Sequence, residues 1–554
     1  MSLSRASFQL FSIASFLRPF GVALLGTALG ILLSMGCAPR ETRVEEGNRT
    51  GTLHVGSPGE PSELDPHIIN APPDFRIVPM LFENLVRGNP ATLEPEPGIA
   101  ESWTLSEDKT VYTFTIRPNA KWTNGDLITA TDFLFSWERA LTPALGSQYT
   151  FLFTDVVGAD DFNAGRTADF STVGFKAPDP RTVVIELKQP TPYFLANMAN
   201  NAIWYPVHRA TLESVGSVTD RSSGWTKPET IVSNGPFKLT SWRPNERIRL
   251  EKSESYWNAD SVRLNALVYH AFDNPSTEEL AFRAGQLHRT VWVPTAKLPG
   301  YREQSDSPLV EVDALIARFL NVNTNRPPFD DARVRRAFAM ALDRDAIAKH
   351  VYLDIAVAAR RVVPLGMPLY PTDEDFSDDQ ELARKLLAEA GYPNGDGFPQ
   401  TELATEAGGS VNLPEAMQAQ WREVLNVDVA ILNSETRVHW DKLNRKDFTL
   451  AIGGWTADYP DATSYLDLWK TGSGYNFTNW TLPEYDQSLL HAARQKTPEE
   501  RFAALRVAEG ILMEHMPIIP LVFEKDVMLH HPSMQNFTPN AMDRPDYSTV
   551  NLMP

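Results

Sequence analysis

The sequence predicts a mixed α/β protein of two or three domains, and three observations support this. The chain has 554 residues, which is more than one simple hydrophobic core accommodates. Segments typical of strands occur at T-L-H-V-G from Thr52, at Val111 to Arg117 and at Thr182 to Leu187. The 42 prolines and 31 glycines are spread along the chain, which favours many short elements over a helical bundle.

Helical periodicity appears first at Thr129, where Phe133, Trp137 and Leu141 align on one face. A later segment, from Ser377 to Gly391, ends in a glycine that is followed by Tyr-Pro, which is a helix stop. These segments alternate with the strands, so both element types belong to the same fold.

A further helix is predicted from Asp330 to Ile347, with Asp330 as its N-cap. This helix carries three arginines, at positions 333, 335 and 336, which could indicate an anion site. Such runs are more often a solvated helix face, and we interpret them in that way.

The composition excludes several classes of function. A formal net charge of −19, with no basic stripe, argues against a nucleic-acid partner. The sequence contains no H-E-x-x-H, G-x-S-x-G or P-loop motif. The adjacent histidines His530 and His531 would point to opposite faces of a strand, so we expect no shared metal. We therefore expect no enzyme activity, no metal and no cofactor.

The N-terminus predicts export. Basic Arg5 and Arg18 precede an apolar run from Phe20 to Gly36, and Cys37, the single cysteine, follows at once. This layout resembles a bacterial lipoprotein signal over residues 1–37, in which Cys37 is lipidated and tethers the protein to a membrane. An uncleaved membrane anchor is the alternative. Residues 38–51 are polar and are predicted to form a flexible tether, and no later run is long enough to span a bilayer.

One segment, Ala451 to Leu466, indicates a binding site. It places Asp458 between two aromatic residues, Trp455 and Tyr459, shortly after a Gly-Gly pair. A carboxylate flanked by rings can hold an ammonium group, and glycines let a ligand approach the backbone closely. Taken alone, a buried tryptophan beside a loop-capping aspartate explains the same pattern.

Three longer segments, Ile99 to Pro143, Ser233 to Asn258 and Phe319 to Arg344, resemble the peptide-binding proteins of bacterial ABC importers, which are family 5 extracellular solute-binding proteins. The likeness runs in order from about Leu53 to near the C-terminus. The sequence G-W-T-A-D-Y is most similar to the oligopeptide-binding members.

This resemblance implies an α/β fold that forms a large two-lobed periplasmic-binding-protein-like clamshell with an additional third domain. Ligand binding would favour its closed state. The expected first lobe comprises residues 52–85, 201–312 and 523–554, the additional domain residues 86–200, and the second lobe residues 313–522.

The resemblance also assigns roles to individual residues. Asp458 matches the aspartate that binds the α-ammonium of the peptide, and the peptide is expected to lie extended like an added strand. The further candidates are the backbone of Gly454 and Thr456, the pocket walls Trp455, Tyr459, Trp440 and Tyr149, and the loop residues Asn70 and Ala71. For Trp455, Trp440 and Tyr149, an ordinary core position is the alternative.

The sequence departs from the enterobacterial oligopeptide binders at one position of interest. Ile452 stands where they have an arginine near the C-terminal end of the peptide. Either Arg445 compensates, or the site does not fix the terminal carboxylate.

We therefore expect an exported, lipid-tethered monomer that captures oligopeptides and delivers them to an ABC transporter permease. A cell-wall peptide, a signalling peptide or a non-peptide solute is the alternative cargo. An extracellular hydrolase and a structural lipoprotein with a degenerate cleft are the alternatives from other classes.

Overall fold

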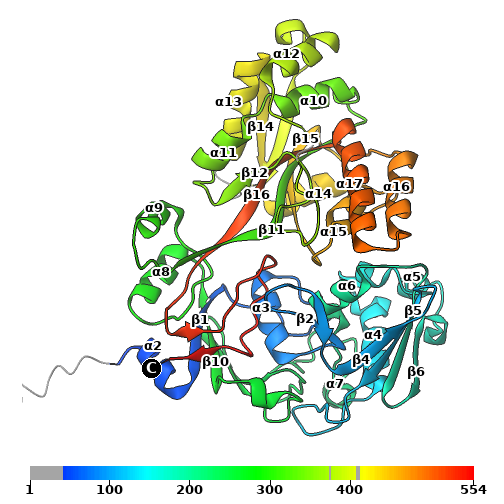
Figure 1. Cartoon of the computed structure of the whole chain (residues 1–554), viewed down its shortest axis with the longest axis vertical. Coiled ribbons are helices and arrows are strands. Elements are labelled where there is room, and N and C mark those ends of the chain that lie inside the picture. Colours follow the sequence, from blue (N-terminus) through cyan, green and yellow to red (C-terminus); the bar gives the residue numbers. More distant parts are fainter. Residues whose placement is uncertain (1–40, 374–375, 407–411, 554) are drawn as a thin grey trace, which may run out of the picture. The chain divides into compact units, whose positions relative to one another are not determined.

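Three larger β-sheets organise the computed structural model, which describes residues 41–373, 376–406 and 412–553 (Figure 1). Cys37, the predicted signal segment and residues 38–40 of the expected tether lie outside the described residues. Residues 43–554 form one compact unit, and each sheet has its own hydrophobic core within it.

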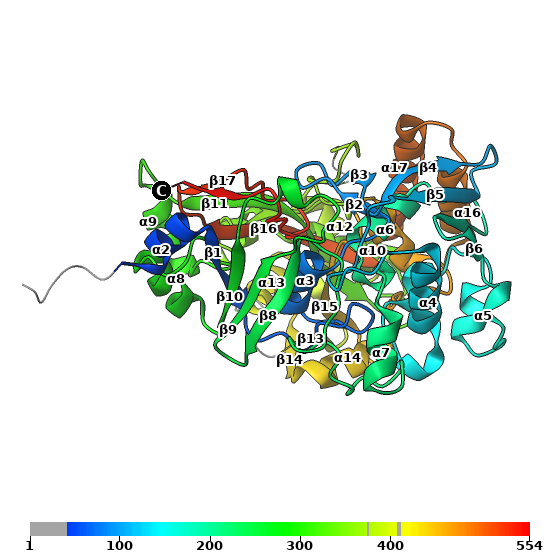
Figure 2. The same ribbon diagram turned by 90° about the horizontal axis from the view of Figure 1, so that it is seen from below.

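The first sheet contains four strands in the order β1-β10-β9-β8, which lie side by side in Figure 2. Its strands are β1 (Thr52–Pro58), β8 (Phe237–Arg243), β9 (Arg247–Lys252) and β10 (Ala266–Phe272). The N-terminal strand β1 pairs in parallel with β10, so segments about two hundred residues apart in sequence share one core. Helix α3 (Pro72–Leu81) packs its apolar residues into this core.

The second sheet has the order β4-β5-β7-β6 and is antiparallel throughout. Its strands are β4 (Ala100–Leu105), β5 (Val111–Ile116), β6 (Phe175–Asp179) and β7 (Thr182–Glu186). Helix α4 (Ala130–Leu141) begins after Thr129, and its predicted apolar face is buried in the same core. The predictions of β1, β5, β7 and α4 are therefore confirmed.

The third sheet contains six strands in the order β12-β16-β11-β15-β13-β14. The strands are β11 (Leu309–Val322), β12 (Ala356–Ala358), β13 (Thr401–Glu406), β14 (Val429–Ser434), β15 (Leu450–Thr456) and β16 (Ile518–Leu529). Figure 1 shows four helices around this sheet, which are α10 (Ala332–Met340), α11 (Arg344–His350), α12 (Gln380–Glu389) and α13 (Leu413–Leu425).

The long strands β11 and β16 extend beyond the core of the third sheet. Leu309 and Leu529, at their distal ends, pack with Phe282 in a separate small cluster. The ladder between the two strands has register shifts between Asp313 and Ala317. The predicted boundaries at 312/313 and 522/523 fall inside these strands, and the division into two lobes and a third domain stays a prediction.

The predicted helix from Asp330 to Ile347 is in fact two helices. Helix α10 (Ala332–Met340) is capped by Asp331 rather than Asp330, and α11 (Arg344–His350) is capped by Asp343. Two aspartates in succession made the cap position ambiguous, and the second cap ends the continuous pattern.

The arginines of α10 are also not a uniformly solvated face, as the sequence suggested. Arg335 is buried and donates to the carbonyl oxygens of His515 and Phe329, at 2.6 and 2.8 Å. It therefore satisfies backbone groups within the fold, whereas Arg333 is exposed and pairs with Asp331.

Most of the segment that was expected to be a flexible tether is helical. Residues Arg43–Thr50 form helix α2, in which Val44 and Gly47 are buried. Gly47 lies against the backbone of Thr52 and the ring of His288. The remaining strands are β2 (Val86–Gly88), β3 (Pro95–Pro97), β17 (Met534–Gln535) and β18 (Asn551–Leu552). The remaining α-helices are α5 (Ala159–Asn163), α6 (Phe194–Asn200), α7 (Arg209–Val215), α8 (Pro275–Arg283), α9 (Leu298–Arg302), α14 (Thr436–Asn444), α15 (Thr463–Leu466), α16 (Pro483–Ala493) and α17 (Pro498–His515).

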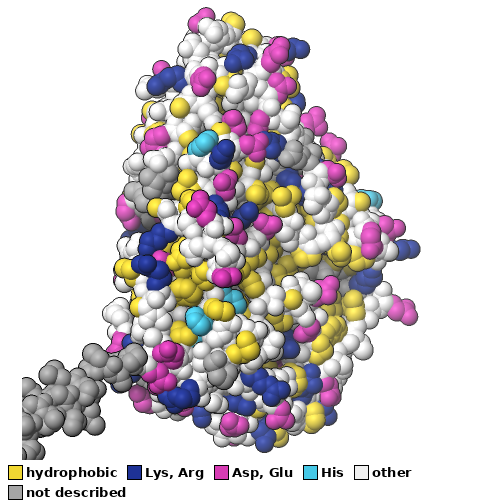
Figure 3. Space-filling view, turned by 60° about the vertical axis from the view of Figure 1, so that its left-hand side comes forward, with side chains coloured by type: hydrophobic (Ala, Val, Ile, Leu, Met, Phe, Trp, Pro, Cys, Tyr) yellow, Lys and Arg dark blue, Asp and Glu magenta, His cyan; other side chains and the backbone are white. Residues whose placement is uncertain are grey.

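The surface carries both signs of charge. Figure 3 shows acidic and basic side chains intermixed on one face of the molecule. Within the part of the chain that the structure describes, no helix combines the length and apolarity needed to cross a membrane.

Candidate functional site

A pocket of about 290 Å³ collects most of the residues that the sequence singled out. Six of the nine predicted ligand contacts line it, while the other four lining residues were not predicted. The predicted residues are Asn70, Tyr149, Gly454, Trp455, Thr456 and Asp458, and the others are Gln148, Phe151, Arg318 and Tyr475. Their part in binding stays a prediction.

Asp458 is held through its backbone and not through its side chain. Its N–H donates to Ser464 Oγ at 2.9 Å, and its carbonyl oxygen accepts from Asn201 Nδ2 at 3.0 Å. Among the described residues, no hydrogen bond or ion pair reaches its carboxylate. Burial raises the pKa of Asp458 to about 7, and the positive charge of Arg544 opposes that rise. The carboxylate is thus fixed in place and lacks a partner.

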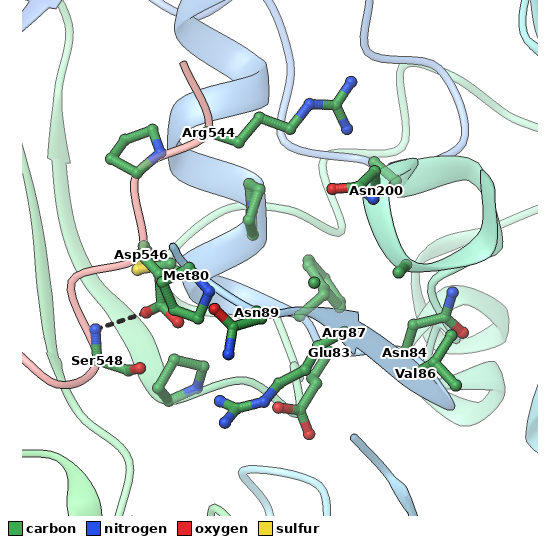
Figure 4. Close-up of a pocket in the computed structure, with 18 of the residues that line it drawn as sticks. Met80, Glu83, Asn84, Val86, Arg87, Asn89, Asn200, Arg544, Asp546 and Ser548 are labelled. Atoms are coloured by element: carbon green, nitrogen blue, oxygen red, sulfur yellow. Dashed lines mark hydrogen bonds between the residues drawn. The ribbon is translucent and has the colours of Figure 1, made fainter. Parts of the chain in front are cut away.

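Arg544 lies close enough to influence Asp458 but forms no ion pair within the described chain. Figure 4 shows its guanidinium pointing away from Glu83 and Asp546, which line a neighbouring cavity of about 100 Å³. Asp546 instead accepts from the backbone N–H of Ser548 at 2.7 Å. The pocket therefore faces one anion that is unpaired within the described chain, and the positive charge of Arg544 acts on it without forming an ion pair.

Aromatic rings form a continuous wall around the pocket. The ring centroids of Tyr149 and Phe151 are 5.8 Å apart, those of Phe151 and Tyr475 5.7 Å, and those of Tyr475 and Trp455 4.8 Å. Such rings attract a cation and exclude water. The Nε1 of Trp455 is buried and has no hydrogen-bond partner among the described residues. It is therefore a donor that the described part of the chain leaves unused.

Among the described residues, the edge of β15 that faces away from β11 is paired only at its start. Strand β13 pairs with β15 only at Leu450 and Ala451, whereas β11 pairs along its whole length. The carbonyl of Ile452 points to the open edge, where it accepts from His439 Nε2 at 3.1 Å. Because the main-chain groups of alternate residues face the same edge, those of Gly454 and Thr456 face it too.

A cation that the sequence reasoning missed lies across β15. Arg318 Nε donates to Glu524 Oε1 at 2.6 Å and Nη2 donates to Oε2 at 3.3 Å. A Cβ at Gly454 would come within 2.8 Å of Arg318 Nη1 and 3.0 Å of the carbonyl oxygen of Ala317, so a larger residue there would displace the end of the arginine side chain. At Gly453 a Cβ would overlap the amide of Asn321.

Three predicted contacts lie elsewhere. Tyr459 is buried, and its ring stacks on Tyr193 at 5.0 Å instead of lining the pocket. Ala71 precedes α3 and donates its N–H to Asp74. Trp440 is 43% exposed and borders a separate cavity of about 20 Å³, which shares Gly454 with the main pocket.

Arg445 does not take the place of the arginine that the enterobacterial relatives have at the position of Ile452. Arg445 is exposed, pairs with Asp441 one turn earlier on α14, and does not line the pocket. Arg318 is the arginine present there. Its signal in the sequence was a lone charge in the apolar strand segment L-I-A-R-F-L.

These features are the ones expected of a solute-binding site. An unpartnered carboxylate, an orphan indole N–H and an open strand edge surround a pocket lined by rings. Among the described residues, no group of three or more His, Cys, Asp or Glu is arranged to hold a metal ion.

Comparisons with known proteins agree with this class. Residues 94–477 match the family described as bacterial extracellular solute-binding proteins, family 5 Middle. The chain is 32% identical to the dipeptide-binding protein DppE of Bacillus subtilis, over 92% of this chain and 94% of DppE. It is 31% identical to the oligopeptide-binding protein OppA of the same species, over 87% and 89% of the two chains.

Solved structures give the same result. A periplasmic oligopeptide-binding protein, OppAIV, of Borrelia burgdorferi is similar with a TM-score of 0.76 and 29% identity, over 91% of this chain and 100% of that one. The murein tripeptide binding protein MppA of Escherichia coli has a TM-score of 0.76 and 27% identity, over 91% and 98%.

The chain belongs to family 5 of the bacterial extracellular solute-binding proteins. It is a solute-binding protein and not an enzyme, and its fold is the α/β clamshell of the oligopeptide-binding proteins. The expectations of family and fold class are confirmed.

Proposed function

We propose that this protein captures oligopeptides outside the cytoplasm and delivers them to the permease of an ABC importer. The observation that carries the proposal is the Asp458 carboxylate, which lines a ring-walled pocket without a partner of its own. The names of the relatives, which include dipeptide-binding and oligopeptide-binding proteins, support the same class of cargo.

The α-ammonium of a peptide supplies the charge that Asp458 lacks. A charge-assisted hydrogen bond to such a group contributes roughly 1.5–3 kcal/mol. A bound ammonium also favours the ionised carboxylate, which offsets the burial that raises its pKa to about 7. Peptide binding and ionisation of Asp458 are therefore linked.

The main chain of the peptide would add to the open edge of β15. Gly454 and Thr456 offer main-chain groups there, and the indole N–H of Trp455 offers one further donor. Main-chain pairing ignores side-chain identity, so this arrangement favours tolerance of many peptide sequences.

The test is a native mass spectrum of the protein purified from residue 38 onward, followed by denaturation and sequencing of whatever is released. We expect a mixture of short peptides with free amino termini. Titration with one such peptide and its N-acetylated form should then show at least tenfold weaker binding of the acetylated form. Equal affinities would contradict the role of Asp458.

A non-peptide cargo is the alternative, because the chain is also 29% identical to a probable deoxycholate-binding periplasmic protein, YgiS, of Escherichia coli, over 86% of this chain. A single released compound without an amino group would favour it. The carboxylate of Asp458 would then have no ligand partner, and Asp458→Asn would leave affinity unchanged.

We further propose that lipidation of Cys37 anchors the protein to a membrane. The support is the sequence layout of a basic segment, an apolar run and one cysteine. Cys37→Ser should abolish incorporation of labelled fatty acid and leave the protein unprocessed or soluble. Unchanged labelling and membrane association would contradict this proposal.

A further inference from the structure

The Arg318–Glu524 ion pair lies in the ligand pocket and has spare hydrogen-bonding capacity. A guanidinium has five N–H donors, and Glu524 takes one from Nε and one from Nη2. No hydrogen bond from Nη1 is formed within the described chain. The arginine side chain is 42% exposed, so its remaining donors are accessible from the pocket.

The position of these free donors is fixed by two neighbours. Glu524 grips one edge of the guanidinium, which leaves the fork little rotational freedom. Gly454 provides the space that the other edge occupies, since a Cβ there would come within 2.8 Å of Nη1. The free Nη1 therefore lies against the part of β15 that offers its backbone to a ligand.

Asp458 and Arg318 thus give one pocket two charged anchors of opposite sign. Gly454, under the guanidinium, and Asp458 are four residues apart, so their Cα atoms are at most about 14 Å apart. This distance corresponds to about four residues of extended peptide. The pocket volume of about 290 Å³ is at the lower end for ligand sites.

We propose that Arg318, oriented by Glu524, binds a carboxylate of the ligand, and that the site selects short peptides with a carboxylate within about four residues of the amino terminus. The inference rests on the proposed capture of peptides through Asp458. The carboxylate is either the C-terminus of a short peptide or an acidic side chain of a longer one. Both present the same planar, bidentate acceptor to a guanidinium.

The test uses calorimetric titration of two matched ligand pairs. The first pair is tri-alanine and tri-alanine amide, which differ only in the terminal carboxylate. The second is Ala-Glu-Ala amide and Ala-Gln-Ala amide, which differ only in a side-chain carboxylate. The parent protein is compared with Arg318→Met, which keeps an unbranched apolar stem and removes the hydrogen-bond donors.

We expect the parent to prefer the carboxylate member of at least one pair by about tenfold, and Arg318→Met to reduce that ratio to within about twofold. A preference in the first pair identifies the C-terminus, and one in the second pair identifies a side chain. Arg445→Met is the matched control, because Arg445 also pairs with a carboxylate, that of Asp441, but lies outside the pocket. It should leave both ratios unchanged.

Arg318→Met leaves Glu524 without its partner, so the double variant Arg318→Met/Glu524→Gln is measured as well, with circular dichroism as the check on folding. If the folded Arg318 variants keep the affinity ratios of the parent in both ligand pairs, the inference about Arg318 is wrong, while the proposed function is unaffected. If Asp458→Asn binds tri-alanine as tightly as the parent does, the proposed function fails, and this inference fails with it.

Discussion

Asp458 and Asp461 are three residues apart in one loop, yet their side chains have opposite surroundings. Asp461 accepts from Arg501 Nη1 and Nη2 at 2.6 and 2.7 Å, and from Thr463 Oγ1 at 2.7 Å. The carboxylate of Asp458 accepts no such bond within the described chain. The described part of the chain supplies hydrogen-bond donors to the carboxylate of Asp461 and none to that of Asp458, which is left available to a ligand.

This difference distinguishes a carboxylate that stabilises the fold from the one that we propose binds the ligand, without reference to any relative. A buried charge that lacks a partner is costly, so a protein retains one only where it has a use. The following predictions test whether the two aspartates divide stability and binding in this way.

The largest effect is expected at the buried ion pair. Asp461→Asn leaves the Arg501 guanidinium buried without its counter-charge, which should lower the free energy of unfolding by about 3–5 kcal/mol. Urea denaturation followed by circular dichroism measures this. Peptide affinity of the folded variant should match that of the parent; a selective loss of affinity with unchanged stability would reverse the assignment.

The complementary variant is Asp458→Asn. It should weaken binding of peptides with free amino termini by on the order of tenfold to a hundredfold, because a charge-assisted bond is replaced by a neutral one. Calorimetric titration at pH 7.5 measures the loss. Its unfolding free energy should not fall, since the carboxylate has no partner to lose.

The stability of the unliganded protein should depend on the ionisation of Asp458, because burial raises the pKa of Asp458 from 3.8 to about 7. The folded state holds this proton more tightly than the unfolded state does. The resulting stability is therefore fully present below the ordinary pKa and is lost as the pH rises through 7. Without ligand, Asp458→Asn should be more stable than the parent at pH 8 and similar to it at pH 4.

Affinity should change in the opposite direction, because binding needs the ionised carboxylate. From pH 5 to 7 the Kd of a free-amine peptide should fall by up to about tenfold per unit, and above pH 8 it should rise as the α-amino group loses its proton. In Asp458→Asn the rise in affinity between pH 5 and 7 should be absent. A parent-like profile in that variant would show that another group titrates.

The smallest effect is expected at Tyr459, which the sequence reasoning placed in the site. Tyr459→Phe keeps the ring stacked on Tyr193, so peptide affinity should stay within about twofold of the parent value. A larger loss of peptide affinity would indicate that the Tyr459 hydroxyl contacts the ligand.

Local patterns were sufficient to predict several elements. Alternation predicted β5, and Thr129 followed by apolar residues at helical spacing predicted α4, because both signals lie within a few residues. The position of Asp458 was similarly readable, since its neighbours in the pocket include Gly454, Trp455 and Thr456 from the same short segment.

The remainder of the site depends on contacts between distant parts of the chain. Arg318 and Glu524 are 206 residues apart, and only the adjacent strands β11 and β16 bring them together. Tyr475 enters the pocket from a loop with no distinctive motif. Tyr459 was misplaced because the side-chain direction after a strand end depends on a packing partner, here Tyr193.

The room that Gly454 leaves for Arg318 has a consequence for how related sequences should vary. A larger residue at position 454 would displace the guanidinium at position 318, so we expect the two positions to change together across the family. The residues at these two positions should therefore indicate the class of ligand. Glycine together with arginine should occur in members whose ligand has a carboxylate near its amino terminus, and other combinations should occur in members that bind other ligands.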